Sequence, residues 1–158
     1  MAEIRFADER DTETILRFIR ALAEYEKLSD VCVADAESLR GSLFGVRPYA
    51  EVLLIEDRKG PQGFALFFHN FSTFLAKPGL YLEDLFVDPA QRGKGYGKAL
   101  LKRLAEIAVE RGCGRLEWSV LDWNKPSIDF YLSLGAKPMD EWTIYRLEGD
   151  SLTGLARS

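Results

Sequence analysis

The stretch LYLEDLFVDPAQRGKGYGK, residues 80–98, decides the fold. Its first part, Leu80–Val87, is apolar and rich in residues that favour a strand. It is followed by three glycines at every second position: Gly93, Gly95 and Gly97. Glycine reaches positive φ, so such a loop can turn successive N–H groups toward one point. Because a helical pattern begins at Lys98, the helix dipole adds to this attraction, and the loop is predicted to bind a phosphate or pyrophosphate.

The residues alone leave three other interpretations of the loop to consider. A tight turn without a ligand can also use glycines. A P-loop for ATP or GTP is disfavoured, because the four residues required before a Gly-Lys-Ser/Thr are missing. A dinucleotide fingerprint reads G-x-G-x-x-G, whereas this loop reads G-x-G-x-G, although Glu117 lies near the distance expected of a ribose-binding acid. A nicotinamide-binding oxidoreductase therefore stays open as a rival on these observations.

Hydrophobic periodicity predicts elements on both sides of this stretch. Before it we expect a strand at Ile4–Ala7, a helix whose apolar face includes Ile15, Phe18, Ile19 and Leu22 with Asp11 as its cap, a helix at Ala36–Leu43, and a hairpin of Glu51–Glu56 and Gly63–His69. After it we expect helices at Lys98–Arg111 and Pro126–Leu134 and strands at Leu116–Val120 and Thr143–Leu147. This order predicts an α/β fold: a mixed sheet covered by helices, antiparallel at first, with a parallel crossover after the central strand.

Composition limits the classes of function. A length of 158 residues with 47% hydrophobic residues fits one domain spanning residues 1–158. The net charge of -4 argues against nucleic acid as a partner. No apolar run approaches the roughly 20 residues that span a bilayer, and the N-terminus is charged, so no membrane association and a cytoplasmic location are expected. Cys32, Cys113 and His69 form no metal or disulfide pattern, and a catalytic triad at His69 is improbable.

Two motifs carry a resemblance to a known family. The residues RGKGYG, 92–97, resemble the R/Q-x-x-G-x-G/A coenzyme A loop of GNAT N-acetyltransferases, and they follow an apolar strand as in that family. The residues NKPSIDFYLSLGA, 124–136, resemble its next segment, N-x-x-S/A-x-x-F-Y-x-x-x-G-A/F. The whole chain further resembles the diamine (spermidine/spermine and thialysine) acetyltransferase branch, through LAEYE at 22–26, LYLEDLFV at 80–87 and residues 117–131.

The resemblance implies acetyl-CoA as cosubstrate and no metal. The matching positions for the pantetheine arm are Leu85, Phe86 and Val87. Those for the pyrophosphate are Arg92, Gly93, Lys94, Gly95, Tyr96, Gly97 and Lys98. On the far side of the cofactor they are Asn124, Lys125, Pro126 and Ser127.

Acetyl transfer to an amine needs two proton movements. A primary ammonium group is neutral in only about one molecule per one or two thousand at pH 7, so its deprotonation costs roughly 4 to 5 kcal/mol. Glu83 and Asp84 interrupt the alternation of their strand, which predicts a β-bulge that redirects a side chain into a cleft. The resemblance implies that Glu83 is the base, directly or through water. It also implies that Tyr131 protonates the leaving thiolate, whereas on the residues alone packing beside Phe130 is the alternative.

The same branch implies the acceptor and the assembly. The matching pocket positions are Tyr25, Glu26, Glu83 and Asp84; Glu141 is a further candidate whose alternative is a solvated turn. Acidic positions favour a small cationic amine such as a diamine, polyamine or lysine analogue, attacked directly in a ternary complex. An aminoglycoside or a peptide amine remains an alternative acceptor. A catalytically silent coenzyme A-binding module remains an alternative function. A homodimer in which the C-terminal segments complete the neighbouring sites is also expected.

Overall fold

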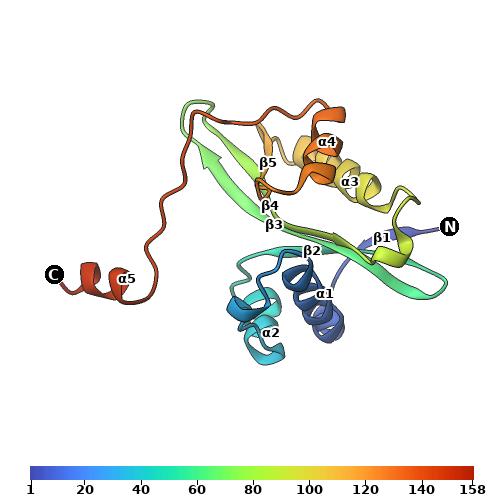
Figure 1. The fold of residues 1–158 in the computed structure, drawn as a ribbon, viewed down its shortest axis with the longest axis horizontal. Helices are drawn as coiled ribbons and strands as arrows, with labels where there is room; N and C mark the ends of the chain where they lie inside the picture. Colours follow the sequence, from blue (N-terminus) through green and yellow to red (C-terminus); the bar gives the residue numbers. More distant parts are fainter. The chain divides into compact units, whose positions relative to one another are not determined.

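The computed structural model describes residues 1–158 as two compact units (Figure 1). Unit 1 comprises Met1–Leu121, and unit 2 comprises Asp122–Ser158. Unit 1 contains the whole sheet, whereas unit 2 contains only helices and connecting segments. Each unit is described by itself below.

Unit 1 is built on a mixed five-stranded sheet with the order β1-β2-β3-β4-β5. The strands are β1 (Glu3–Phe6), β2 (Glu51–Asp57), β3 (Gly60–Ser72), β4 (Lys77–Val87) and β5 (Leu116–Trp118). Neighbouring strands are antiparallel except for β4 and β5, which are parallel. The predicted hairpin and the predicted parallel crossover are therefore both confirmed, because a parallel pair requires a long connection between its strands.

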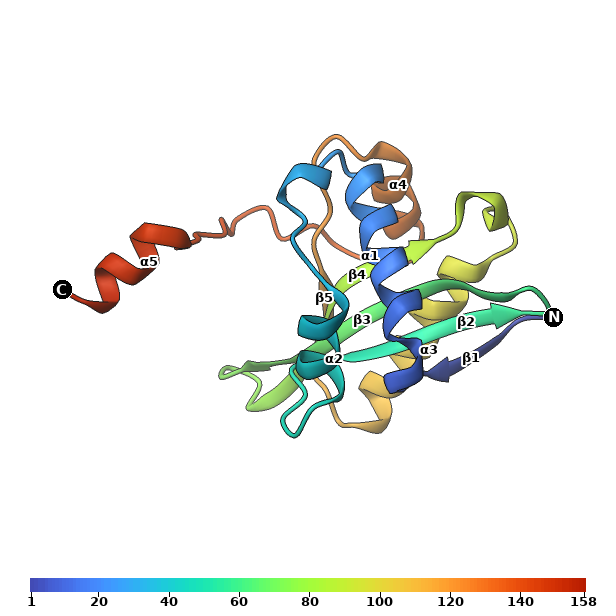
Figure 2. The same ribbon diagram turned by 90° about the horizontal axis from the view of Figure 1, so that it is seen from below.

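Helices cover both faces of this sheet, with α1 and α2 on one side and α3 on the other (Figures 1 and 2). Their bounds are α1 (Thr12–Tyr25), α2 (Ala36–Phe44) and α3 (Tyr96–Glu110), and single 3-10 turns lie at Glu9–Asp11, Ser29–Val31 and Pro89–Gln91. The predicted apolar face of α1 is buried: Phe18 stacks on Phe64 with ring centroids 5.7 Å apart and lies 6.0 Å from Phe86. No helix in either unit has the length and apolarity that crossing a bilayer requires.

The start of α1 differs in detail from the prediction. Asp11 does occupy the N-cap position, but its carboxylate makes no capping hydrogen bond. It accepts two hydrogen bonds from Arg5 instead, at 2.8 and 2.9 Å, and one from the Asp8 N–H at 2.8 Å. A 3-10 turn directly precedes the helix, so the carboxylate serves that turn and the strand rather than the first turn of α1.

Unit 2 contains α4 (Lys125–Ser133) and α5 (Gly149–Ala156). The predicted strand at Thr143–Leu147 is wrong, since these residues form no regular structure. Their side chains are largely exposed, with Ile144 at 77% and Tyr145 at 89%. A strand needs a neighbouring strand for its main-chain hydrogen bonds, and unit 2 has no other strand to supply them.

Candidate active site

β4 carries a bulge at Glu83, as the sequence predicted. Two consecutive residues of β3 pair with Asp84 and Leu82 of β4, which leaves Glu83 as the extra residue. Leu82 is buried, Glu83 is exposed and Asp84 is half-buried. In a regular strand, two adjacent side chains point to opposite faces of the sheet. The bulge interrupts this alternation at the two adjacent carboxylates.

Three carboxyl groups interact at this bulge. Burial is the largest cause that raises the pKa of Asp84, and together with the charges of Glu83 and Glu26 it brings this pKa to about 7. Burial also raises the pKa of Glu26, the C-cap residue of α1, and the charge of Glu83 acts in the same direction. The cluster Glu26–Glu83–Asp84 therefore concentrates negative charge and holds one carboxyl group that titrates near neutral pH, both of which suit a cationic ligand.

We expect Asp84→Asn to raise the free energy of unfolding at pH 8 but not at pH 4. The pKa of Asp84 rises from 3.8 to about 7 on folding, so between these values the folded chain holds a proton that the unfolded chain releases. Stability therefore falls as pH rises through this window, and removing the charge should recover about 1 to 2 kcal/mol at pH 8. Urea unfolding at both pH values measures this, with the exposed acid Asp30→Asn as the matched control. An equal gain at both pH values would contradict the charge explanation.

Two of the three predicted loop glycines have the left-handed backbone conformation, whereas Gly97 lies within the first turn of α3. Gly93 and Gly95 have φ of 85° and 80°, in the left-handed region, and a Cβ added to either would meet no atom within 4 Å. Glycine is thus required here by backbone conformation rather than by crowding. Gly95 is the N-cap of α3 and provides no capping side chain, so the first N–H groups of this helix have no acceptor from it. The helix starts at Tyr96, slightly earlier than predicted, and its open end fits an anion.

Between the bulge and the loop, one edge of β4 has no neighbouring strand. β5 pairs only with Leu80, Tyr81 and Leu82 of β4. The main chain of residues 83–87 is therefore unpaired on that side, and this segment includes the predicted pantetheine positions Leu85, Phe86 and Val87. Sequence periodicity did not predict this free edge of β4. The extent of β5 depends on how far it pairs with β4, which its own residues do not determine.

Arg92 connects the loop to the acidic cluster. Its guanidinium lies over the ring of Tyr25, 5.0 Å from the centroid, and Tyr25 is the last residue of α1. The structure thus brings Tyr25, Glu26, Glu83, Asp84 and Arg92 to one end of α1. The sequence had assigned Arg92 and Tyr25 to different ligands and did not predict their contact.

Of the remaining predicted site residues, Lys94 donates to Oε1 of Gln91 at 2.6 Å and Lys98 lies in the first turn of α3. The others belong to unit 2. Asn124 is buried and is the N-cap of α4, where its side chain accepts from the Ser127 N–H at 3.4 Å. Lys125 pairs with Asp129 at 2.8 Å, and Pro126 lies in the first turn. Tyr131 follows within α4, and its ring centroid is 5.7 Å from that of Phe130. Glu141 is exposed, beyond the end of α4. The joint action of Tyr131 with Glu83 stays a prediction.

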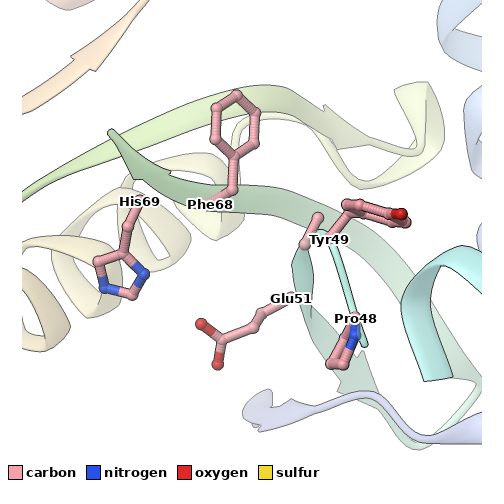
Figure 3. A pocket seen from close by; sticks show the side chains of 6 residues that line it. Pro48, Tyr49, Glu51, Phe68 and His69 are labelled. Atoms are coloured by element: carbon pink, nitrogen blue, oxygen red, sulfur yellow. The ribbon is translucent and has the colours of Figure 1, made fainter. Parts of the chain in front are cut away.

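A shallow pocket of about 210 Å³ contains the only histidine (Figure 3). It is lined by Pro48, Tyr49, Ala50, Glu51, Phe68 and His69. Arg111 donates to both carboxylate oxygens of Glu51, at 2.6 and 3.0 Å, and its guanidinium lies 3.4 Å from the His69 ring. No serine or cysteine lines this pocket, in keeping with the sequence argument against a triad at His69.

Comparison with known proteins identifies the family. The model of the acetyltransferase (GNAT) family matches residues 19–136. A thialysine N-epsilon-acetyltransferase of Bos taurus is 42% identical over 97% of this chain and 96% of its own length. An L-ornithine N5-acetyltransferase of Arabidopsis thaliana is 34% identical over 98% of this chain and 87% of its own length.

A solved structure gives the same result for the fold. An integron cassette protein from the mobile metagenome of V. cholerae superposes with a TM-score of 0.84 at 31% identity, covering 99% of this chain and 98% of its own. The predicted fold class, a mixed sheet flanked by helices in the GNAT arrangement, is therefore confirmed. The chain belongs to the GNAT acetyltransferase family and is an N-acetyltransferase that acts on amines.

Proposed function

We propose that this chain, as one domain spanning residues 1–158, transfers acetyl from acetyl-CoA to a primary amine of a small cationic substrate. The observation that supports this most directly is the carboxyl cluster Glu26–Glu83–Asp84. Two of its members, Glu83 and Asp84, lie on β4, the strand that leads into the glycine loop, so an acidic acceptor site and an anion site adjoin along this strand. Acidic groups attract the protonated amine, and the loop attracts the diphosphate.

The coenzyme fits the loop and the free edge of β4. The left-handed glycines and the uncapped start of α3 offer N–H groups to a diphosphate. The unpaired main chain near Leu85, Phe86 and Val87 offers donors and acceptors to the amides of the pantetheine arm. In unit 2, the start of α4 with Asn124 and Ser127 is the proposed contact on the far side of the coenzyme. Bound acetyl-CoA supplies the thioester carbonyl that the amine nitrogen attacks directly in a ternary complex.

Glu83 takes the proton from the amine in this proposal, directly or through water. The bulge turns it to solvent, where an entering substrate can reach it. A bound cation lowers the raised pKa values of Asp84 and Glu26, so both carboxyl groups ionise beside the substrate and hold it by charge. Tyr25 forms the wall next to them. Tyr131 donates its phenolic proton to the leaving thiolate, a transfer that a hydroxyl with a pKa of about 10 can make. Glu141 is a further proposed contact for the acceptor.

The acceptor is proposed to be a small amino compound with at least two cationic or amino groups, since relatives act on thialysine and on ornithine. Release of free thiol from acetyl-CoA should be measured with thialysine, ornithine, spermidine and an aminoglycoside. We expect the highest kcat/KM for one of the first three. Binding of acetyl-CoA without thiol release for any amine would indicate a silent coenzyme A-binding module. Binding of NAD without binding of coenzyme A would indicate the oxidoreductase rival.

We further propose a homodimer assembled through the C-terminal segment. Unit 2 exposes apolar side chains along this segment: Trp142, Ile144, Tyr145, Leu147, Leu152 and Leu155. A run of this kind marks an interaction surface, and a second copy is the partner proposed here. Light scattering should give twice the mass of the chain, and Ile144→Asp with Leu155→Asp should give the single mass. A single mass for the unaltered protein would refute this assembly.

A further inference from the structure

The hairpin between β2 and β3 holds both ends of the glycine loop. At the first end, the Asp88 N–H donates to the Gln62 carbonyl at 2.8 Å. At the second end, the hydroxyl of Tyr96 donates to Oδ2 of Asp57 at 3.1 Å. Asp88 directly follows β4, and Tyr96 is the first residue of α3, so the loop that carries the left-handed glycines is held between these two contacts.

Within the hairpin, these two attachment points are joined to each other. Gln62 is the extra residue of a register shift between β2 and β3, and its side chain donates to Oδ1 of Asp57 at 3.1 Å. The Lys59 N–H donates to the same oxygen at 2.8 Å. One carboxylate therefore uses Oδ1 to hold the hairpin turn and Oδ2 to hold the start of α3. Gln62 itself is buried, which keeps the bulge in one conformation.

The hairpin pairs with the end of β4, where Gly63 lies opposite Val87. Gly63, next to Gln62, lies so close to the end of β4 that an added Cβ would approach the Phe86 carbonyl oxygen to 2.6 Å. Glycine at this position therefore permits the close pairing of the hairpin with the strand from which the loop leaves. The Lys59 N–H holds the pKa of Asp57 below its usual range, and the Tyr96 hydroxyl, Gln62 and the Lys94 charge lower it as well, so the carboxylate is ionised at neutral pH.

We infer that Asp57 is a positioning residue for the coenzyme, acting through Tyr96 to fix the N–H groups that open α3 in the orientation that receives the diphosphate. This rests on the proposed use of acetyl-CoA. Asp57 does not touch the coenzyme in this scheme, and its negative charge would oppose a diphosphate at close range. Its contribution is preorganisation: an anion site with fixed donors binds more tightly than one that must be ordered on binding.

The test is calorimetric binding of acetyl-CoA and of coenzyme A to the full chain. Tyr96→Phe and Asp57→Ala should each raise Kd about three- to tenfold, the range expected for the net contribution of one typical hydrogen bond. The double variant should bind no more weakly than the single variant with the higher Kd, since both substitutions remove the same hydrogen bond. KM for acetyl-CoA should rise in parallel, whereas kcat and KM for the amine should stay within about twofold of the unaltered values.

Two variants separate positioning from a general structural defect. Tyr49→Phe, an exposed tyrosine outside the loop, should bind like the unaltered protein. Asp57→Asn should bind more tightly than Asp57→Ala, because the amide oxygen can accept from the hairpin turn while its NH₂ group donates to the Tyr96 oxygen. Unaltered Kd values in Tyr96→Phe and Asp57→Ala, or additive losses of affinity in the double variant, would overturn this inference and leave the proposed function standing. Failure of the unaltered protein to bind either form of the coenzyme would overturn the proposed function and this inference together.

Discussion

We expect Tyr131→Phe to lower kcat by about 100-fold with little change in Kd for acetyl-CoA, because a positioned general acid contributes about 10² to 10⁴ to the rate. The substitution removes only the phenolic oxygen and keeps the ring that lies 5.7 Å from Phe130. Packing in α4 is therefore retained, and the loss should fall on protonation of the leaving thiolate. Steady-state thiol release and calorimetry together measure the two quantities.

The control for this variant is Tyr49→Phe, which removes the same oxygen from an exposed tyrosine in unit 1. It should leave kcat and Kd unchanged. A kcat for Tyr131→Phe within about threefold of the unaltered enzyme would remove the acid role from Tyr131, since a lost general acid cannot be replaced by water at so small a cost. The packing interpretation would then stand for this residue.

The second large effect is expected for Glu83→Gln. Without the base, the amine must lose its proton to solvent, and kcat/KM at pH 7 should fall by about 100-fold. The charge of Glu83 is also one of the causes that raise the pKa of Asp84 to about 7, so this pKa should fall in the variant. Below that pKa the cluster loses negative charge, so the acid limb of the kcat/KM profile should move to lower pH. The pH–rate profile and carboxyl carbon NMR of Asp84 measure both effects.

Glu110→Gln, an exposed change at the end of α3, is the matched control and should leave both measurements as they are. If Glu83→Gln kept its turnover and Asp84→Asn lost it, the base would be Asp84. Asp84 is the alternative base because burial and two neighbouring carboxylates raise its pKa to about 7. The three carboxyl groups are coupled, so the profile reports the cluster as a whole and the variants assign it.

Much of the fold near the site could be predicted from short stretches of sequence. The bulge at Glu83 was predicted from two adjacent carboxylates in a strand, and the left-handed glycines from their alternation before a helix. The prediction of a strand at Thr143–Leu147 is wrong because it depends on a distant partner. Its β-branched and aromatic residues are typical of a strand, but residue type does not supply a partner, and a strand exists only where another main chain completes its hydrogen bonds.

The sequence by itself determined the strand, the glycine loop and the helix of residues 80–110, because hydrophobic period and glycine conformation are local properties. Only the tertiary structure decided that Glu26 lies within electrostatic range of Glu83 and Asp84, that Arg92 lies over Tyr25, and that Asp57 holds Tyr96. These contacts join residues that are far apart in the chain. Their burial and charge, and hence the raised pKa of Asp84, depend on how the strands and helices pack, which no single stretch of sequence encodes.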